Sequence, residues 1–370
     1  MQFVGIDLHT NRFTCCYLNE DGKEKTMRTF ELSPEDLKGF YKTLTRDTIV
    51  LIEATVNTFD FAKLFRHAVQ EVIIANTYQL KNINLSDKKT DKVDADKLAR
   101  MLKLQVLGGE KLIVGVTIPP KEISDLRSLF ASYRIIRKQI TQTKNRIHSL
   151  LKENLYPFIK EYIFGKKTRK AIRSISQDQI LSFRINFWMD SLERLESSFG
   201  ILEERIKIAG APFMKEIDIL SSLSSLSVIT ALAIIADIID VSRFRNSKKF
   251  ASYLRSAPRV ESSNEHTIIK STNKAGRKLS ITLLSQSLNH FRDSNKKLNA
   301  WYGRLSIYKK KGVVRMALCR RVFTEIYQVL KKNEYHRFIN PRLHGKKMLE
   351  YKNLLERNNI VFQENYQIPA

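Results

Sequence analysis

Two carboxylates lie near the ends of predicted strands that are otherwise apolar. A charged side chain is unusual there unless it has a functional role. Asp7 lies at the end of the apolar stretch QFVGIDLH, and Glu53 lies at the end of DTIVLIEA. If these strands are neighbours in a sheet, the two carboxylates meet, and burying like charges side by side is costly unless a cation lies between them. A divalent metal ion is the natural answer, because hard cations prefer oxygen ligands.

A predicted helix near residue 91 supplies two more carboxylates. Asp91 and Asp94 are three residues apart and therefore share one helical face, whereas Asp96 points elsewhere. Asp87 is a competitor, but Thr90 is a good N-cap and would leave Asp87 outside the helix. A lone carboxylate is usually a solvated surface group. Four carboxylates that converge instead fit two Mg²⁺ ions, which activate an attacking oxygen and stabilise the leaving one.

The segment 1–110 must position these groups, and it alternates predicted strands with predicted helices. Apolar, β-branched and aromatic stretches predict the strands, and capped stretches with helical spacing predict the helices. In chain order we expect strands at 2–9, 12–19 and 24–32, a helix at 33–44, a strand at 47–54, a helix at 59–69, a strand at 71–76 and a helix containing 90–102. This is the element order of the α/β RNase H-like fold, although doubly wound domains show a similar order.

The segment 111–210 has a different character. Apolar residues recur every three or four positions along 122–155 and again along 181–206, which predicts two long helices joined by the basic link FGKKTRK. Such a pair forms an antiparallel hairpin or an oligomerising coiled coil, with an intramolecular bundle as the plainer alternative. We expect a homo-oligomer, either a dimer or a tetramer.

From residue 211 onward the chain is predicted to be mainly helical. The apolar run 221–239 has a serine-rich entrance, and two further helices are expected at 277–291 and 312–332. The stretch 256–275 is expected to be a loop. The polar tail contains PRLHGKK, which is a loop signal, and is expected to be peripheral.

The net charge of +26 is unevenly distributed. Residues 1–110 carry 16 Lys and Arg against 16 Asp and Glu, so residues 111–370 carry the whole excess, 48 against 22. Within them, 241–330 holds 20 basic and four acidic residues. Such a surface suits a polyanion, because Lys and Arg displace counterions from phosphates. A merely soluble basic surface is the alternative.

Other features of the sequence limit the classes of protein to which the chain can belong. The longest apolar run, 227–239, is shorter than the ~20 residues that a membrane span needs. No signal peptide is apparent at the N-terminus. Cys15, Cys16 and Cys319 are spaced neither as a disulfide framework nor as a zinc site, so we expect a reducing cytoplasm.

Two sets of motifs resemble one known family. They are GID…IEAT…KKTDKVDADKLARML and SRFRNSKKFASYLRSAPRVESSN…STNKAGRKL. With these motifs the chain resembles, over about 1–335, the DEDD-type transposases of the insertion-sequence 110 family, which are related to the Piv DNA invertase. The resemblance implies a RuvC-like, RNase H-like domain in which Asp7, Glu53, Asp91 and Asp94 are the metal ligands.

The same resemblance implies a nucleophile. In the family the catalytic serine follows a proline by five residues, which from Pro258 gives Ser263 and not its neighbour Ser262. The implied enzyme is a recombinase whose serine forms a covalent phosphoserine link with DNA, assisted by two Mg²⁺ ions. Family members also resemble systems in which a structured bridge RNA pairs with donor and target DNA. A location at the prokaryotic nucleoid follows.

The resemblance also implies a division of the chain into four segments. These are a RuvC-like DEDD catalytic domain at 1–110, a helical coiled-coil segment at 111–210, a C-terminal transposase domain with the serine at 211–335 and a peripheral tail at 336–370.

Four positions depart from the family pattern. The family usually has glycine where this chain has Arg255, Asn264, Ser225 and Ser227. Asparagine tolerates left-handed backbone geometry best of the other residues, so Asn264 keeps the loop shape accessible. Because all five chemical residues are present, an active enzyme is expected; an inactivated copy is the alternative.

Basic residues near the serine are expected to contact phosphates. They are Arg243, Arg245, Lys248, Lys249, Arg259, Lys274, Arg277 and Lys278. His9 and His266 are candidates for proton transfer, against the plainer interpretation of exposed loop histidines. Three other functions compete: an invertase without a guide RNA, a RuvC-like nuclease that uses water, and a non-catalytic nucleic-acid-binding protein.

Overall fold

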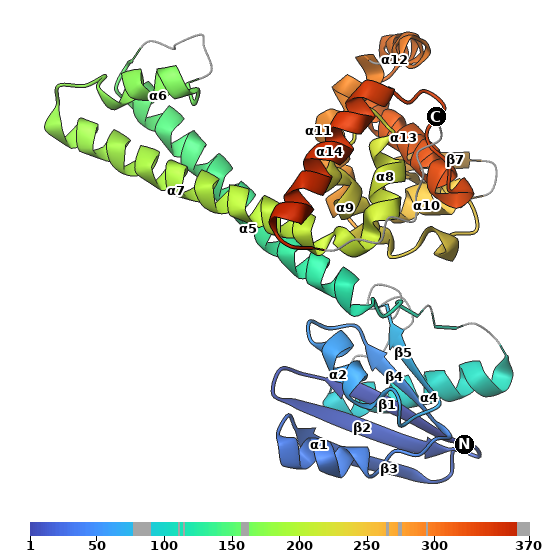
Figure 1. Ribbon diagram of the computed structural model, residues 1–370. Coiled ribbons are helices and arrows are strands. Elements are labelled where there is room, and N and C mark those ends of the chain that lie inside the picture. Colours follow the sequence, from blue (N-terminus) through green and yellow to red (C-terminus); the bar gives the residue numbers. More distant parts are fainter. Residues whose placement is uncertain are drawn as a thin grey trace. The chain divides into compact units, whose positions relative to one another are not determined.

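The computed structural model divides into two units, Met1–Pro119 and Pro120–Ala370, which are described separately (Figure 1). The structure describes residues 1–76, 90–109, 112, 113, 115–156, 163–263, 266–272, 276–293 and 295–360, with the backbone alone for 260–263 and 266–271. No helix in these ranges combines the length and the apolar character that crossing a membrane requires.

A five-stranded sheet forms the centre of the first unit. Its strands are β1 (Gln2–Leu8), β2 (Arg12–Asn19), β3 (Lys25–Glu31), β4 (Thr48–Glu53) and β5 (Glu71–Ala75). Their order in the sheet is β3-β2-β1-β4-β5, with β1 antiparallel to β2 and parallel to β4. The predicted RNase H-like fold class is confirmed, and strands one and four are neighbours as expected.

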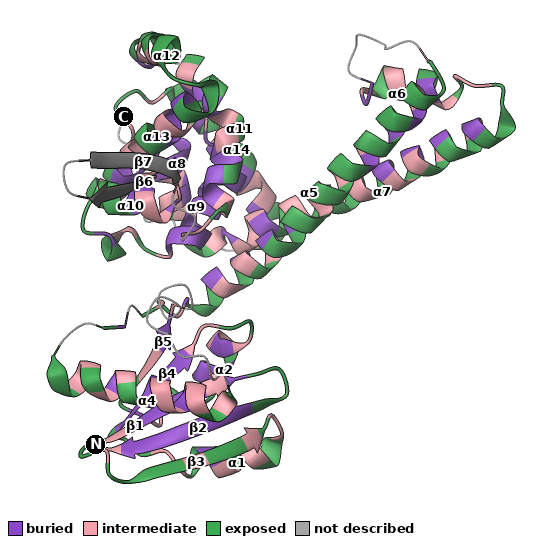
Figure 2. Ribbon diagram, turned by 180° about the vertical axis from the view of Figure 1, so that it is seen from behind, coloured by how far each residue is buried: buried purple, intermediate pink, exposed green. Residues whose placement is uncertain are grey.

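Helices cover both faces of this sheet. Helices α1 (Pro34–Tyr41) and α2 (Thr58–Phe65) pack on the face that carries Val4 and Ile6, and α4 (Asp91–Gly108) packs on the face that carries Phe3. Strand residues alternate between the faces, so the adjacent Cys15 and Cys16 belong to different cores. Figure 2 shows the burial of β1, β2 and β4 between these layers.

Gly5 allows helix α4 to lie directly on strand β1. A Cβ atom at Gly5 would stand 2.2 Å from the Ala95 carbonyl oxygen and 2.3 Å from the Ala99 nitrogen, both in the backbone of α4. Ala95 and Ala99 are themselves small and fully buried. Because backbone atoms cannot turn aside as a flexible side chain can, any larger residue at Gly5 would force the helix away from the sheet.

The second unit is mainly helical, as predicted. Its helices are α5 (Lys121–Glu153), α6 (Lys166–Arg173), α7 (Gln179–Ala209), α8 (Met214–Ser221), α9 (Val228–Ile238), α10 (Ser247–Tyr253), α11 (Leu279–Asp293), α12 (Lys296–Tyr308), α13 (Lys311–Lys332) and α14 (Pro341–Arg357). Two single 3₁₀ turns lie at Ala211–Phe213 and Val241–Arg243.

Helices α5 and α7 lie side by side as the predicted hairpin, and most of the basic link FGKKTRK forms α6 at its far end. Ile147, Ile185, Met189 and Leu192 are buried there. Whether the hairpin also mediates oligomerisation stays a prediction.

Helix α9 is the centre of the second unit, since every one of its residues is buried. It packs against α5, α7, α8 and α11, and it shares one continuous core with α13 and α14. Its sole ionisable residue, Asp237, accepts hydrogen bonds from the Ser280 nitrogen at 2.8 Å and the Ser280 hydroxyl at 2.7 Å. This pair ties α11 to the end of α9.

The loop predicted at 256–275 is wrong in its centre. Strands β6 (Pro258–Ser263) and β7 (His266–Thr272) pair there in antiparallel fashion, with Ser263 opposite His266. The serines and charged residues of PRVESS and HTIIKST suggested a loop, but Val, Ile and Thr favour extended backbone.

The loop predicted around PRLHGKK is also wrong. Asn340 accepts a hydrogen bond from the Leu343 nitrogen at 3.1 Å, and Pro341 occupies the first turn of α14, so both residues start a helix. Met348, Tyr351 and Leu355 recur at helical spacing and are buried in the core.

Helix α12 was not predicted, because its buried side is restricted to Leu298.

Arg255 adopts the left-handed conformation at the end of α10. Its φ is +58°, its nitrogen donates to the Ser252 carbonyl, and the Ser256 nitrogen donates to the Ala251 carbonyl. These two bonds form a Schellman motif, in which glycine is the usual residue at the left-handed position. The Arg255 guanidinium Nε donates to the Gly276 carbonyl across the base of the β6–β7 hairpin. The side chain thus links the two ends of the segment that contains Ser263.

We predict that Arg255→Gly is more stable than Arg255→Ala by about 1 kcal/mol, because both variants lose the side-chain bond but only glycine relieves the left-handed strain. Urea unfolding midpoints of the full chain measure the difference. Lys248, exposed within α10, is the matched control: there Lys248→Gly should be the less stable variant, by about 1 kcal/mol. If glycine were more stable than alanine at both positions, or less stable at both, the assigned backbone strain at Arg255 would be contradicted.

Candidate active site

Asp7 and Glu53 stand at the same edge of the sheet. The paired register of β1 and β4 runs to Ile6 opposite Ile52, and each carboxylate is the next residue in its strand. Residues alternate between the sheet faces, so Asp7 shares the face of Phe3 and Gly5, which α4 covers. Glu53 shares the face of Leu51, the same one, by the same alternation. The strands therefore direct both groups to the side where α4 begins.

Helix α4 starts at this edge with two carboxylates. The Thr90 hydroxyl accepts a hydrogen bond from the Val93 nitrogen at 3.4 Å, which confirms Thr90 as the N-cap. Asp91 and Asp94 occupy the first turn, where the unpaired N–H groups and the helix dipole favour negative charge. The contact of α4 with Gly5 holds this turn beside the end of β1.

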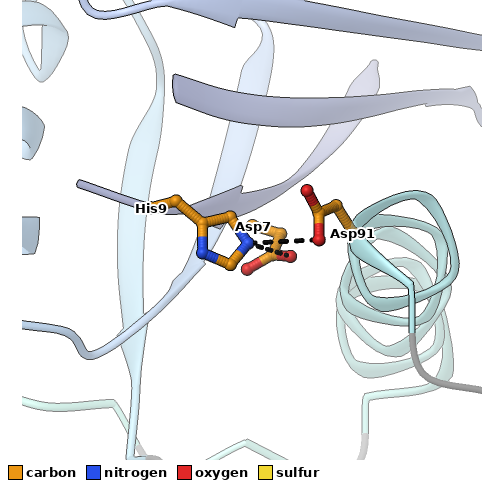
Figure 3. Close-up of side chains that lie close together, drawn as sticks. All are labelled: Asp7, His9 and Asp91. Carbon is orange, nitrogen blue, oxygen red and sulfur yellow. Dashed lines mark hydrogen bonds and ion pairs between the residues drawn. The ribbon is translucent and has the colours of Figure 1, made fainter. Parts of the chain in front are cut away.

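His9 joins Asp7 to Asp91. The His9 Nε2 atom lies 3.2 Å from an oxygen of Asp7 and 3.3 Å from an oxygen of Asp91 (Figure 3). One ligand atom from each of the three residues falls within 4.8 Å of the others. The second oxygen of Asp91 forms an ion pair of 3.0 Å with the Arg12 guanidinium. The first unit thus brings Asp7 and Asp91 together, whereas Glu53 and Asp94, which were predicted to converge with them, are not part of this group among the described residues.

The pKa values record the repulsion within this cluster. Burial raises the pKa of Asp7, and the nearby charges of Asp91 and Asp94 raise it further, against the opposing effect of His9. At Asp91 burial is the largest single effect and also acts upward, but His9 and Arg12 together outweigh it and lower the pKa. Asp94 is thereby within electrostatic range of Asp7, and it forms an ion pair of 3.8 Å with Lys97.

This donor set fits a divalent cation. Carboxylate oxygens are the ligands that Mg²⁺ and similar ions take, and an imidazole nitrogen stands among them. In the protein alone, Arg12 supplies positive charge beside Asp91, and the His9 ring lies between Asp7 and Asp91.

Arg12 is the residue that the sequence interpretation missed. It starts β2, directly after the short turn that follows β1, and the His9 nitrogen donates to its carbonyl at 2.9 Å. The sequence does place this basic residue just across a tight turn from Asp7, and that position could have indicated its role. Asp96 points elsewhere as predicted, because it pairs with Lys25 at 3.0 Å and Arg100 at 3.1 Å. Asp87 lies outside the described residues.

Ser263 belongs to the second unit, where it is the last residue of β6. The structure describes its backbone, and Asn264 lies outside the described residues. Gly276, at the base of the same hairpin, has no room for a side chain, since a Cβ atom would stand 1.7 Å from the Tyr253 carbonyl oxygen. Ser227 has a structural role of its own as the N-cap of α9, accepting from the Thr230 nitrogen at 3.2 Å.

The basic residues predicted to contact phosphates differ in their surroundings. Six of them are exposed: Arg243, Arg245, Lys248, Lys249, Arg259 and Lys278. Arg243 donates to the Ile238 carbonyl at 2.5 Å and lies over the Tyr253 ring. Arg277 is partly buried near Arg127, and Lys274 lies outside the described residues.

Comparison with known proteins gives two matches to family models. Residues 4–156 match the model of the DEDD transposases of insertion sequence IS110, described as a transposase. Residues 217–302 match a second model, described as the transposase IS116/IS110/IS902 family. No curated protein matches the chain. The first match spans the four carboxylates and the second spans Ser263, and the DEDD model indicates the use of a divalent metal.

We predict that Asp7→Asn raises the melting temperature at pH 7 in EDTA. A folded-state pKa raised above the ordinary 3.8 means that ionised Asp7 costs stability, a cost that appears as the pH rises through the folded value and is absent below about pH 4. The variant and the wild type should therefore converge in acid. With metal at a hundred times its Kd, the wild type should gain about 2.7 kcal/mol and the variant far less.

Thermal unfolding with and without MnCl₂ measures both effects. The control is Asp60→Asn, which removes an exposed carboxylate of α2 that is 84% accessible and paired with Lys63. It should behave as the wild type in both conditions. An equal metal-induced gain in Asp7→Asn would exclude Asp7 as a ligand.

Proposed function

The chain belongs to the IS110 family of DEDD transposases, enzymes that recombine DNA, and from this premise we propose that it cuts and rejoins DNA through a covalent phosphoserine at Ser263. Asp7, Glu53, Asp91 and Asp94 would hold two Mg²⁺ ions for this reaction. The observation that carries the proposal is the approach of Asp7 and Asp91 at one sheet edge, where both lie within reach of one ion; Glu53 ends the neighbouring strand, and Asp94 lies in the same first turn of α4 as Asp91. Ionised carboxylates this close together repel one another, which destabilises the folded protein unless a cation lies between them.

In the proposed step the Ser263 hydroxyl oxygen attacks a phosphorus of the DNA backbone. A bond forms between serine and phosphorus, the bond to one DNA oxygen breaks, and the serine proton is lost as the departing oxygen gains one. The later attack of another DNA hydroxyl reverses the exchange, so one phosphodiester is converted into another without an external energy source. Bound Mg²⁺ supplies positive charge at the attacking and leaving oxygens.

His9 and Arg12 have a role in this proposal that the contacts support. Arg12 compensates the charge of Asp91 in the protein alone, and His9 lies 3.3 Å from the same carboxylate. Once a divalent ion takes over that compensation, the guanidinium of Arg12 becomes available to a phosphate oxygen, for which its planar fork is well suited.

We propose further that a structured RNA guides the enzyme and that it acts at the nucleoid. The supporting observation is the charge distribution, in which the segment after residue 110 carries the whole basic excess of the chain. Two nucleic acids need such a surface, and recognition by base pairing needs few base-reading side chains.

Ser263→Ala should abolish a covalent protein–DNA adduct, whereas Ser262→Ala should retain at least half of it, since only one hydroxyl is the nucleophile. The full chain is incubated with Mg²⁺ and DNA containing the element ends, denatured, and analysed for DNA-linked protein by gel electrophoresis. An adduct that survives Ser263→Ala would overturn the serine assignment. DNA cleavage without any adduct would favour a nuclease that uses water.

RNA guidance predicts that a discrete RNA copurifies with the protein and that ribonuclease treatment lowers recombination at least tenfold. Sequencing of the copurified RNA should reveal loops complementary to donor and target DNA. Adding the transcribed RNA back should restore activity. Full activity after ribonuclease treatment would instead favour an invertase-like recombinase that needs no guide.

A further inference from the structure

A cavity in the second unit is separate from both parts of the proposed active site. It has a volume of about 500 Å³ and is lined by side chains of α5, α7, α9, α11 and α14. Neither the DEDD carboxylates nor the β6–β7 hairpin contributes to it. We refer to it as the α14 pocket.

Basic side chains dominate the charged lining of the α14 pocket. Four are cationic and two are acidic, which leaves two positive charges in excess: Arg137, Lys207, Lys347 and Arg357 against Glu203 and Glu350. Glu350 pairs with Lys346 outside the pocket, at 3.9 Å, and Glu203 accepts from the Tyr133 hydroxyl at 3.5 Å. Among the residues that the structure describes, no carboxylate lies within 4.0 Å of any of the four cations.

Lys347 is held in place without a counter-ion. Its ammonium donates to the Ser224 carbonyl at 2.7 Å and to the Leu226 carbonyl at 2.8 Å, in the turn that leads into α9. Burial lowers its pKa to about 8, and no acidic group offsets that effect. An ammonium has three donors, so a further acceptor is still needed. A half-buried cation of this kind is stabilised by an anion that enters the pocket.

Arg137 is also preorganised at the rim. Its guanidinium donates to the Gln286 side chain and to the Tyr133 hydroxyl, and it lies 5.8 Å from the centre of the Tyr133 ring. A guanidinium fixed by neutral partners keeps its full charge and its remaining donors for a ligand. The first turn of α9, Val228 to Thr230, lines the same pocket and adds the positive end of a helix.

We infer that the α14 pocket binds a backbone phosphate of single-stranded nucleic acid. Fixed guanidinium and ammonium groups are the donors that recognise phosphate. The family's partner is DNA, so the anion at hand is a nucleic-acid phosphate. A concave pocket of this volume admits one nucleotide of a flexible strand, whereas the phosphates of a duplex are presented on a convex surface. Both single-stranded DNA and RNA carry this group.

The test compares two double variants of the full chain that each remove two charges from α7 and α14. Lys207→Met with Arg357→Gln removes charges that line the pocket. Arg205→Gln with Lys346→Met removes exposed charges from the same helices outside it. Fluorescence anisotropy in EDTA then measures the binding of labelled 20-nucleotide DNA and RNA single strands over a range of salt concentrations.

We expect the pocket variant to bind one of the two strands about tenfold more weakly, with a salt slope lower by about 0.7, the value for one phosphate contact of a single strand. The exposed variant should lose less than threefold. The strand that is affected, DNA or RNA, identifies the source of the phosphate. Equal losses in both variants, or none in either, would overturn the inference.

Photochemical cross-linking independently locates the bound strand on the protein. Strands carrying 4-thiothymidine or 4-thiouridine should, after irradiation, attach to peptides that contain Tyr133 or Tyr351, both of which line the pocket. Attachment confined to other peptides would likewise overturn the inference. Because EDTA removes divalent ions, these results are independent of the proposed metal site and of Ser263.

Discussion

Mutual repulsion among Asp7 at the end of β1 and Asp91 and Asp94 at the start of α4 is the constraint on which the first unit depends. Asp7 is driven toward its neutral form by burial and by Asp91 and Asp94. A fold that gathers these charges must supply both the packing that holds them and the positive charge that offsets them. The packing comes from Gly5, where the backbone of α4 lies against β1 with no space for a side chain.

The offsetting charge comes from the turn between β1 and β2. His9 stands between Asp7 and Asp91, and Arg12 takes the outer oxygen of Asp91. These are side chains at the surface, with His9 and Arg12 about half exposed, so their interactions are weak and readily exchanged. The acids themselves are carried by strands and a helix start, which are rigid. A rigid set of anions with exchangeable cations is suited to bind a metal and a phosphate in turn.

The first unit was largely predictable because its determinants are local. Apolar runs with a charge at the end specify β1 and β4, and Thr90 specifies where α4 begins, so the place of each carboxylate follows from its own segment. The contribution of Arg12 was not predictable in this way, because it depends on where a turn brings a polar residue. Helix α14 was misjudged for another reason: its lysines hide the spacing of Met348 and Tyr351, which packing with α8 reveals.

The departures from the family pattern acquire physical meaning in the second unit. A serine at 227 is a better start for α9 than glycine, since its hydroxyl accepts a hydrogen bond from the helix. An arginine at 255 is a worse end for α10, since it holds a left-handed backbone. Its side chain offsets part of the backbone strain by donating a hydrogen bond to the Gly276 carbonyl at the other end of the hairpin. Neither change touches a group that we propose to react: Ser227 affects the start of α9, whereas Arg255 affects how firmly the hairpin of Ser263 is held, and not the chemistry that it carries.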